Sequence, residues 1–404
     1  MTETTTKQPF WKKELSVSRK TKPPKDEPPK EKTPKAKREK PVRAKRSKGG
    51  SDAQRIVGLK IGASQLAAAT VSNNGAAELL QVARHDLAPG IVVGGELREP
   101  EKLSAALQEF FDKHSLSKRN VRLGVANNRI GVRTFDITGV ADPAQLDNAV
   151  RFRAQETLPI PIDDAVLDYH VLSESTDHAG QNLKRVLLVV AYRDLVDRYV
   201  SACRKAGIEL SAIDLEAFAL LRSMGAPRED QGAAALVVVS VGHDRSTFAV
   251  SDGRFCEFAR VLEWGGSSLN VALARALNMA PSETEVLKRA LDLRVTAPPP
   301  GFTDAQARTA TDAVTRQIES FARELVSSLH FYQGQPGSLS IGEVVLTGGS
   351  AHMGGFAEEL ERLIGVPVRV GDPLRRVRVG KNAVAGDERQ IGSYAIAIGL
   401  GIED

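Results

Sequence analysis

The sequence has little cysteine and no long apolar run, and these absences narrow the class of protein. The only two cysteines, Cys203 and Cys256, lie far apart and fit no metal-binding or redox spacing, so we expect reduced thiols in a cytosolic protein. No apolar stretch approaches the roughly 18–20 residues of a membrane-spanning helix. The polar, basic start lacks the apolar segment of a secretory signal, and we therefore expect none.

The excess of positive charge belongs to one segment of this 404-residue chain. Residues 1–50 hold 17 Lys and Arg against 6 Asp and Glu, a net charge of +11. Because the whole chain carries +5, the remainder holds 38 basic against 44 acidic residues, a net charge of −6. We therefore expect a mildly acidic folded part that follows a basic tail.

Residues 1–54 are rich in Lys and Pro and poor in large apolar side chains. Such a segment buries too little surface to offset the entropy of ordering, so we predict a disordered basic tail. It would either attract anionic lipid or nucleic acid, or serve only solubility. The patch Phe10-Trp11-Lys12-Lys13 could also touch a membrane surface or a partner.

Three glycine turns organise the rest of the chain. The stretch EVVLTGGSAHMGG, residues 343–355, predicts a buried strand, a loop with little side chain and a helix start. Similar turns follow the strands expected at 57–64 and 237–247. Each turn either brings backbone N–H groups close to an anionic ligand or needs glycine only for its conformation.

The order of elements around two of these turns repeats. Strand, glycine turn, strand, Asn-Gly or Asp-Gly turn and strand occur in residues 55–87 and again in 234–262, which indicates an internal duplication. A separate α+β unit lies between the copies, and a helix is expected over Asp214–Met224. The predicted division is a tail (1–54), a first lobe (55–130 and 213–230), an inserted subdomain (131–212) and a second lobe (231–404) with a small helical subdomain at about 270–300.

Several long stretches carry a resemblance to a known family. These are ADPAQLDNAVRFRAQETLPIPIDDAVLDYHVL (141–172), AIDLEAFAL (212–220) and VVLTGGSAHMGGFAEELERLIG (344–365). From about residue 55 to 402 the chain resembles the type IV pilus assembly protein PilM family, actin-like ATPases related to FtsA. The resemblance implies an α/β, two-lobed actin-like fold made of duplicated ribonuclease-H-like domains, with an inserted small α+β subdomain.

The resemblance also implies a nucleotide site between the lobes. Phosphates would meet the two glycine turns and a helix start, the late turn would meet adenosine, and a helix would present an acid and a base to ribose and adenine. In this sequence those positions are Gly62, Ala63, Ser64, Gly242, His243, Gly265, Gly266, Glu285, Lys288, Gly348, Gly349 and Ser350. Glu285 and Lys288 could equally form a simple ion pair at (i, i+3).

Two positions depart from the family pattern. Lys60 and Ser240 stand where the family has the carboxylates that hold Mg²⁺ and its waters. In the sequence only Asp244 adjoins either turn. We therefore expect weak ATP binding and little dependence on Mg²⁺, and we assign neither catalytic residues nor metal ligands.

These observations predict a scaffold protein of type IV pilus assembly. By resemblance it would bind the short cytoplasmic N-terminal segment of a PilN-like inner-membrane protein in a groove beside the inserted subdomain, and it would meet other pilus assembly components. Its place would be cytoplasmic, on the inner face of the membrane through its partner. The alternatives are an active Mg²⁺-dependent ATPase or sugar-kinase-like enzyme, and a protein that binds nucleic acid or membrane surfaces through its tail. No nucleic-acid reader motif is present, so no nucleic-acid partner is expected.

Overall fold

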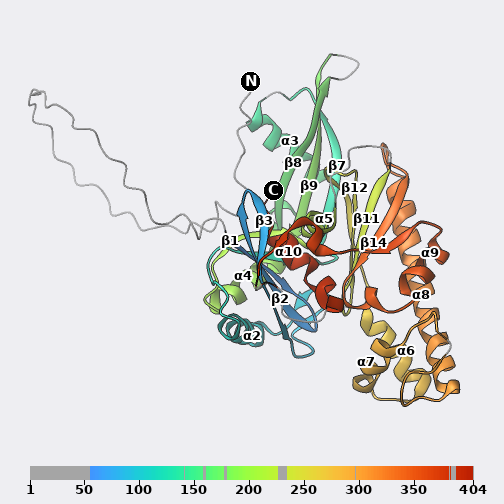
Figure 1. Ribbon diagram of the computed structural model, residues 1–404. Helices are drawn as coiled ribbons and strands as arrows, with labels where there is room; N and C mark the ends of the chain where they lie inside the picture. The colour runs from blue at the N-terminus through green and yellow to red at the C-terminus, as the bar shows by residue number, and fades with distance from the viewer. Residues whose placement is uncertain are drawn as a thin grey trace, which may run out of the picture.

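We describe the protein from a computed structural model, in which residues 55–140, 142–157, 161–176, 180–225, 234–295, 297–381, 383 and 388–403 are described. The predicted tail, residues 1–54, lies outside these ranges, and so do residues 158–160 of the expected helix stop. Two β-sheets lie side by side with helices around them, and a third, smaller sheet stands above their junction (Figure 1).

The elements follow the predicted alternation closely. The strands are β1 (Arg55–Ile61), β2 (Gln65–Asn74), β3 (Ala76–Asp86), β4 (Val92–Val93), β5 (Glu96–Leu97), β6 (Val121–Val125), β7 (Ile130–Thr138), β8 (Ala165–Thr176), β9 (Asn182–Tyr192), β10 (Leu210–Leu215), β11 (Ala235–Val241), β12 (Ser246–Ser251), β13 (Cys256–Leu262), β14 (Ile341–Thr347), β15 (Val368–Val370) and β16 (Arg378–Val379). The helices are α2 (Pro100–Lys113), α3 (Pro143–Thr157), α4 (Arg193–Lys205), α5 (Glu216–Met224), α6 (Gly266–Leu277), α7 (Pro281–Ala290), α8 (Asp304–Gln333), α9 (Phe356–Ile364) and α10 (Ala395–Gly401), with short 3₁₀ turns at Ile162–Asp164, Gly349–His352, Pro373–Arg376 and Glu388–Tyr394.

The two large sheets share one topology. In the first the order is β10-β6-β1-β2-β3-β16, and in the second it is β13-β12-β11-β14-β15. In each, three antiparallel strands linked by hairpins are followed on the other side of the first strand by two parallel strands. This is the duplicated ribonuclease-H-like arrangement, and it confirms the predicted internal repeat and two-lobed fold.

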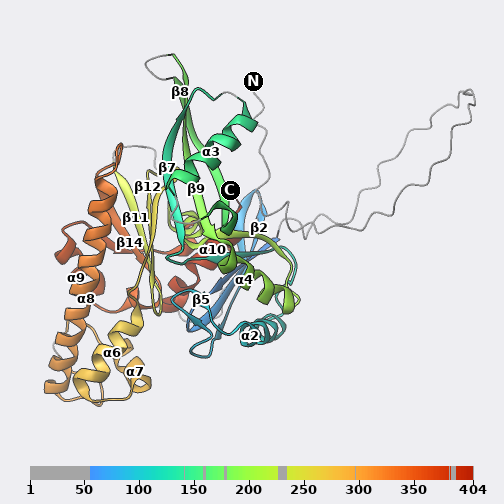
Figure 2. The ribbon, with the colours of Figure 1, turned by 180° about the vertical axis from the view of Figure 1, so that it is seen from behind.

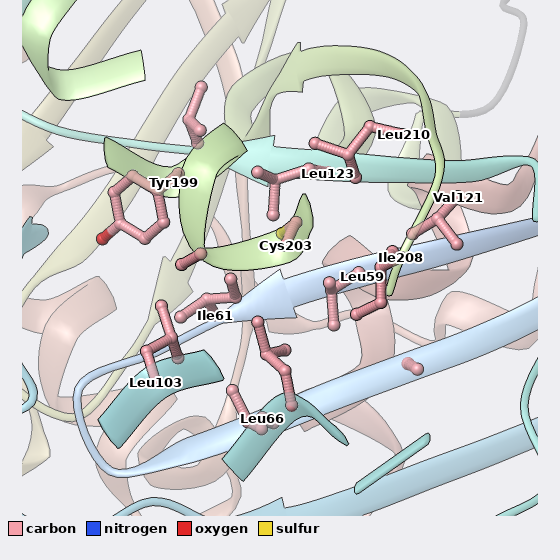
Figure 3. Close-up of a cluster of buried hydrophobic side chains, with 14 of the residues drawn as sticks. Leu59, Ile61, Leu66, Leu103, Val121, Leu123, Tyr199, Cys203, Ile208 and Leu210 are labelled. Carbon is pink, nitrogen blue, oxygen red and sulfur yellow. The ribbon is translucent and has the colours of Figure 1, made fainter. Parts of the chain in front are cut away.

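The first lobe buries its core between the first sheet and the helices α2 and α4. Leu59, Leu123, Leu103 and Cys203 fill this space and are almost inaccessible to solvent (Figure 3). The two cysteines are free and buried, Cys203 in this core and Cys256 at the start of β13, and burial raises the pKa of each thiol to about 12. Their thiolate fraction at neutral pH is therefore negligible.

In the second lobe, helices α8 and α9 lie beside the sheet, and α6 packs on α8 below it, as both ribbon views show (Figure 2). The helix α8 contributes a buried stripe that includes Ile318, Phe321 and Leu325, as its spacing predicts. The ring of Trp264 stacks on Phe321 at a centroid distance of 4.2 Å. This contact holds the start of α6 against the core.

The inserted module, residues 130–192, is a three-stranded antiparallel sheet with the order β7-β9-β8. The helix α3 covers one face through Leu146, Val150 and Ala154. On the opposite face Val132 and Leu187 join the core of the first lobe. The module therefore packs on the first lobe instead of projecting freely.

The helices α5 and α10 lie between the two large sheets (Figure 1). They approach so closely that a Cβ atom on Gly399 would lie 1.7 Å from the carbonyl oxygen of Ala219. Arg222 of α5 also donates to the carbonyl oxygen of Gly399 at 2.9 Å. Close helix packing thus forms part of the junction between the lobes.

Two sequence-based boundaries differ from the structure. The helix expected over Asp214–Met224 begins at Glu216, because Leu210–Leu215 forms β10, parallel to β6. The sequence predicts a last helix over Gly392–Ile402, but the helix begins at Ala395, since residues 388–394 form a 3₁₀ segment. Within the range predicted for the second lobe, β16 pairs with β3 of the first sheet. The division into domains otherwise stays a prediction.

Candidate functional site

The two glycine turns that the sequence singles out are built alike and face one cavity. In the first, the amide of Gly62 donates to the carbonyl of Gln65 at 2.9 Å, and in the second, the amide of Gly242 donates to Arg245 at 3.0 Å. Both turns line the cavity between the lobes, and each leaves the amides of its next two residues for another acceptor. A phosphate would have to meet those amides, because the turn itself occupies the first one.

The start of α6 packs against the second turn. A Cβ atom on Gly265 would lie 2.5 Å from the carbonyl oxygen of His243, so only glycine fits there. The amides of Gly266 and Ser267 donate to the carbonyls of Gly242 and His243 at 2.9 and 2.7 Å. The helix start that the sequence offers to an anion is therefore satisfied by the protein's own carbonyl groups.

The third glycine turn, Gly348–Ser350, lies against the end of β11 and the start of α6. Gly348 has φ = +96°, and a Cβ atom there would lie 2.2 Å from the carbonyl oxygen of Val241. A Cβ atom on Gly266 would meet Ser350 Oγ at 2.5 Å and Lys288 Nζ at 3.4 Å. The structure thus brings together Gly266, Lys288 and Ser350, which are far apart in sequence.

The predicted acid–base pair on α7, Glu285 and Lys288, is bonded within the protein in this structure. Lys288 Nζ lies 2.6 Å from Glu285 Oε2, and the same carboxylate accepts from Asn270 and Arg289 at 2.9 and 3.0 Å. Burial acts to raise the pKa of Glu285, but the hydrogen bonds from Lys288 and Asn270 outweigh it and hold the pKa below its usual range. A ribose hydroxyl would have to compete with these partners.

Glu216 is the site residue that sequence reasoning missed. It is the first residue of α5 and is 3% exposed, and its Oε2 accepts from Thr247 Oγ1 at 3.3 Å. Lys60 Nζ lies 3.9 Å from the same oxygen. In the sequence only Asp244 adjoins either turn, but in the fold the end of β10 brings a second carboxylate from a distant part of the chain. The signal available was the strand-length stretch LSAIDL, residues 210–215, with Leu, Ala, Ile and Leu among its residues, which ends directly before Glu216.

Asp244 itself serves a contact between the lobes. Its Oδ2 accepts from the amide of Gly94, in the β4–β5 hairpin of the first lobe, at 2.8 Å. Next to it, Gly95 has φ = +73°, and a Cβ atom there would lie 1.2 Å from Arg245 Nη1. Tyr199 donates to the carbonyl of Gly95 at 3.1 Å. We call this set, Gly94 and Gly95 against Asp244 and Arg245, the lobe clasp.

The residues between the turns do not suit a divalent metal ion. Mg²⁺ requires oxygen ligands, and the described part of the chain holds no group of three or more His, Cys, Asp or Glu placed to bind a metal. Asp244 is bound to Gly94, and Glu216 has the Lys60 ammonium beside it. At about 4 Å and an effective dielectric constant of about 20, an ammonium repels a divalent ion by roughly 8 kcal/mol, which equals the attraction of a single carboxylate at the same distance.

A larger, shallow groove lies elsewhere, between α8 and α9. It is lined by Glu319, Arg323, His330 and apolar side chains such as Val326 and Leu363. It contains none of the glycine turns, so it offers no backbone donors to a phosphate. Among the described helices, none is both long and apolar enough to cross a bilayer.

Two duplicated lobes whose glycine turns face each other across a cavity define the protein as an actin-like protein. A family comparison makes this specific: the chain belongs to the family of the type IV pilus assembly protein PilM, whose model matches residues 58–404. The same span contains the inserted module and all three glycine turns.

Individual relatives agree with this placement. The chain is 24% identical over 350 residues to the cell division protein FtsA of Pseudomonas aeruginosa, covering 79% of this chain and 83% of the relative. Among solved structures, the PilM-PilN type IV pilus biogenesis complex is similar with a TM-score of 0.71 and 24% identity, covering 86% of this chain and 97% of that chain. MreB 5 of Spiroplasma citri bound to AMPPNP is similar with a TM-score of 0.51 and 11% identity, covering 86% and 95%.

Proposed function

We propose that this protein is an actin-like scaffold of type IV pilus assembly that binds the cytoplasmic N-terminal segment of a PilN-like membrane protein beside its inserted module. The match to the PilM family over residues 58–404 is the observation that carries the proposal. The similar PilM-PilN complex supports the kind of partner. Through that partner the scaffold would lie on the inner face of the membrane and meet further pilus assembly components.

The charge of the module side suits such a partner. Cytoplasmic segments next to a membrane span carry an excess of Lys and Arg. On β8, Tyr169 faces α3, so Asp168 and His170 lie on the opposite face, where the His170 ring is 5.7 Å from Phe255 of the second lobe. Asp168 is half-buried there, and burial raises the pKa of its carboxyl. A basic group from a partner would offset the cost of that buried charge.

The test is a titration of the full chain into a fluorescein-labelled peptide that reproduces the N-terminal cytoplasmic segment of the PilN-like protein from the same organism. We expect saturable anisotropy with a Kd in the micromolar range, about −8 kcal/mol, and weaker binding of a scrambled peptide. Asp168→Asn should weaken binding several-fold.

The matched control is Asp136→Asn, the same chemical change at an exposed position on β7, which should bind like the unchanged chain. No binding of the native peptide at protein concentrations well above the micromolar range would refute the partner. Equal affinities for both Asn variants and the unchanged chain would refute the placement beside Asp168.

We further propose that the nucleotide site binds weakly and does not turn over. Glu216 favours the alternative of an active ATPase, because a buried carboxylate between the turns could position water. Against it, Lys60 pairs with that carboxylate and Ser240 supplies no carboxylate for a metal ion. Release of phosphate from ATP with Mg²⁺ should stay at background, and steady turnover abolished by Glu216→Gln would establish the ATPase instead.

A further inference from the structure

An ammonium group stands between the two glycine turns. The side chain of Lys60 is 18% exposed and that of Glu216 is 4% exposed, and their charged atoms are 3.9 Å apart. Glu216 has two partners, because Thr247 also donates to it. The Lys60 ammonium therefore does not have to satisfy the carboxylate alone, and it can direct other N–H groups elsewhere. An ammonium carries three donors, so one can serve Glu216 while others face the cavity that Lys60 lines.

Hydroxyl groups line the cavity beside Lys60 at Ser240 and Thr247. Ser240 on β11 pairs in register with Thr247 on β12, so the two side chains share one face of the second sheet. Because Thr247 already donates to Glu216, Ser240 is the hydroxyl of this pair that can donate to a phosphate oxygen. It does so without adding charge, whereas a carboxylate in its place would repel the phosphate unless a cation intervened.

The Lys60 ammonium therefore places a cation in the site without a metal ion. Relative to a carboxylate at position 60, Lys60 raises the local charge by two units, which equals the charge that one divalent ion brings. A bound Mg²⁺ normally bridges carboxylate and phosphate oxygens. An ammonium beside Glu216 and open to the cavity can make the same bridge.

We propose that the site takes a nucleoside di- or triphosphate in its metal-free form, with Lys60 bridging Glu216 and a phosphate oxygen. This inference rests on the proposed nucleotide site, and it adds that the divalent ion is replaced by a side chain. Mg²⁺ in solution then competes with the protein for the phosphates instead of assisting binding.

The experiment is calorimetric titration of the full chain with ATP, ADP and pyrophosphate, each in EDTA and in excess Mg²⁺. We expect ATP and ADP to bind in EDTA at least as tightly as in Mg²⁺. Lys60→Met should weaken binding in EDTA about tenfold or more, the usual scale for a charge-assisted contact. Lys60→Asp should abolish binding in EDTA and restore part of it in Mg²⁺. Weak binding of pyrophosphate alone would show how much the phosphate contacts contribute.

Lys205→Met, which removes an exposed Lys on α4 with the same change in charge, is the matched control and should bind ATP like the unchanged chain. Thermal unfolding of every variant checks that it is folded. Tighter binding in Mg²⁺ than in EDTA, equal affinity of Lys60→Met and the unchanged chain, or no binding of ATP at all would each overturn the inference. Because the PilN-like peptide is titrated into the same preparations, a failure of the scaffold proposal is seen separately.

Discussion

At the scale of single residues, Gly399 is the described glycine whose added Cβ atom would lie nearest to another backbone atom. In the interior of a helix, alanine is favoured over glycine by about 1 kcal/mol. Here the added Cβ would lie 1.7 Å from the Ala219 carbonyl oxygen, which forces α5 and α10 apart. We therefore expect Gly399→Ala to lower the free energy of unfolding by about 2 kcal/mol, measured by urea denaturation.

Gly131 is the matched control for this substitution. It lies in β7, and a Cβ atom there would have no neighbour within 4 Å. Gly131→Ala should be neutral or raise stability by about 0.5 kcal/mol. If Gly399→Ala were as stable as Gly131→Ala, the close approach of α5 and α10 would be wrong.

The sequence was sufficient to locate the glycine turns, but it did not reveal Glu216, which lies between them in the fold. Gly62 and Gly242 are recognisable because a turn between two strands needs small residues at fixed places. Glu216 is not recognisable in this way, since its role depends on β10 lying next to β6, a contact between residues about 90 positions apart. The pairing of Lys60 with Glu216 depends on the same long-range contact.

At the scale of elements, β8 carries a charged group that the fold partly buries. Burial raises the pKa of Asp168, with Asp214 adding to the effect and His170 opposing it. Because the pKa is higher in the folded state than in the unfolded chain, folding favours the protonated form. The stability associated with that proton is present below the pKa of the unfolded chain and is lost as pH rises through the folded pKa.

Asp168→Asn imitates the protonated carboxyl and keeps an oxygen that can accept from the Tyr169 amide, as Asp168 does at 2.9 Å. The variant should melt at a higher temperature than the unchanged chain at pH 7, and the difference should vanish near pH 3. Asp136→Asn should show no such dependence on pH. A lower melting temperature at pH 7 would mean that Asp168 has a stabilising partner in its charged form.

One of the two misassigned boundaries has a clear physical cause. Residues 214–224 contain Leu, Ala and Glu, which favour helix, so local preference predicts a helix that begins at Asp214. Pairing of β10 with β6 overrides this preference at Asp214 and Leu215 and postpones the helix to Glu216. Elements that begin at a glycine turn, such as β3 after Gly75, were predicted within one or two residues.

At the scale of the whole molecule, the lobe clasp links the second glycine turn to the first lobe. Asp244→Ala removes the acceptor of the Gly94 amide, a hydrogen bond of about 1 kcal/mol. Hydrogen exchange over residues 92–97 should therefore quicken several-fold. Asp252→Ala removes a carboxylate from the β12–β13 turn and should leave that segment unchanged. Equal exchange in both variants would show that the clasp does not hold the lobes together.

The repeat in the sequence predicts part of the architecture of the whole molecule but not all of it. Recurring turns were enough to predict two similar lobes, since each copy has to form its own sheet. They could not show that β16 would return to the first sheet, because a strand of two residues has no pattern of its own.

The packing of α10 on the first sheet bears on how the protein is made. The strand β16 extends the sheet that contains β1, and α10 covers β1 and β2. While the ribosome is still translating the second lobe, the nascent first lobe therefore exposes the apolar surface that Ala397 and Ile398 later cover. A premature stop codon anywhere before α10 would leave even the earlier-synthesised lobe without this cover.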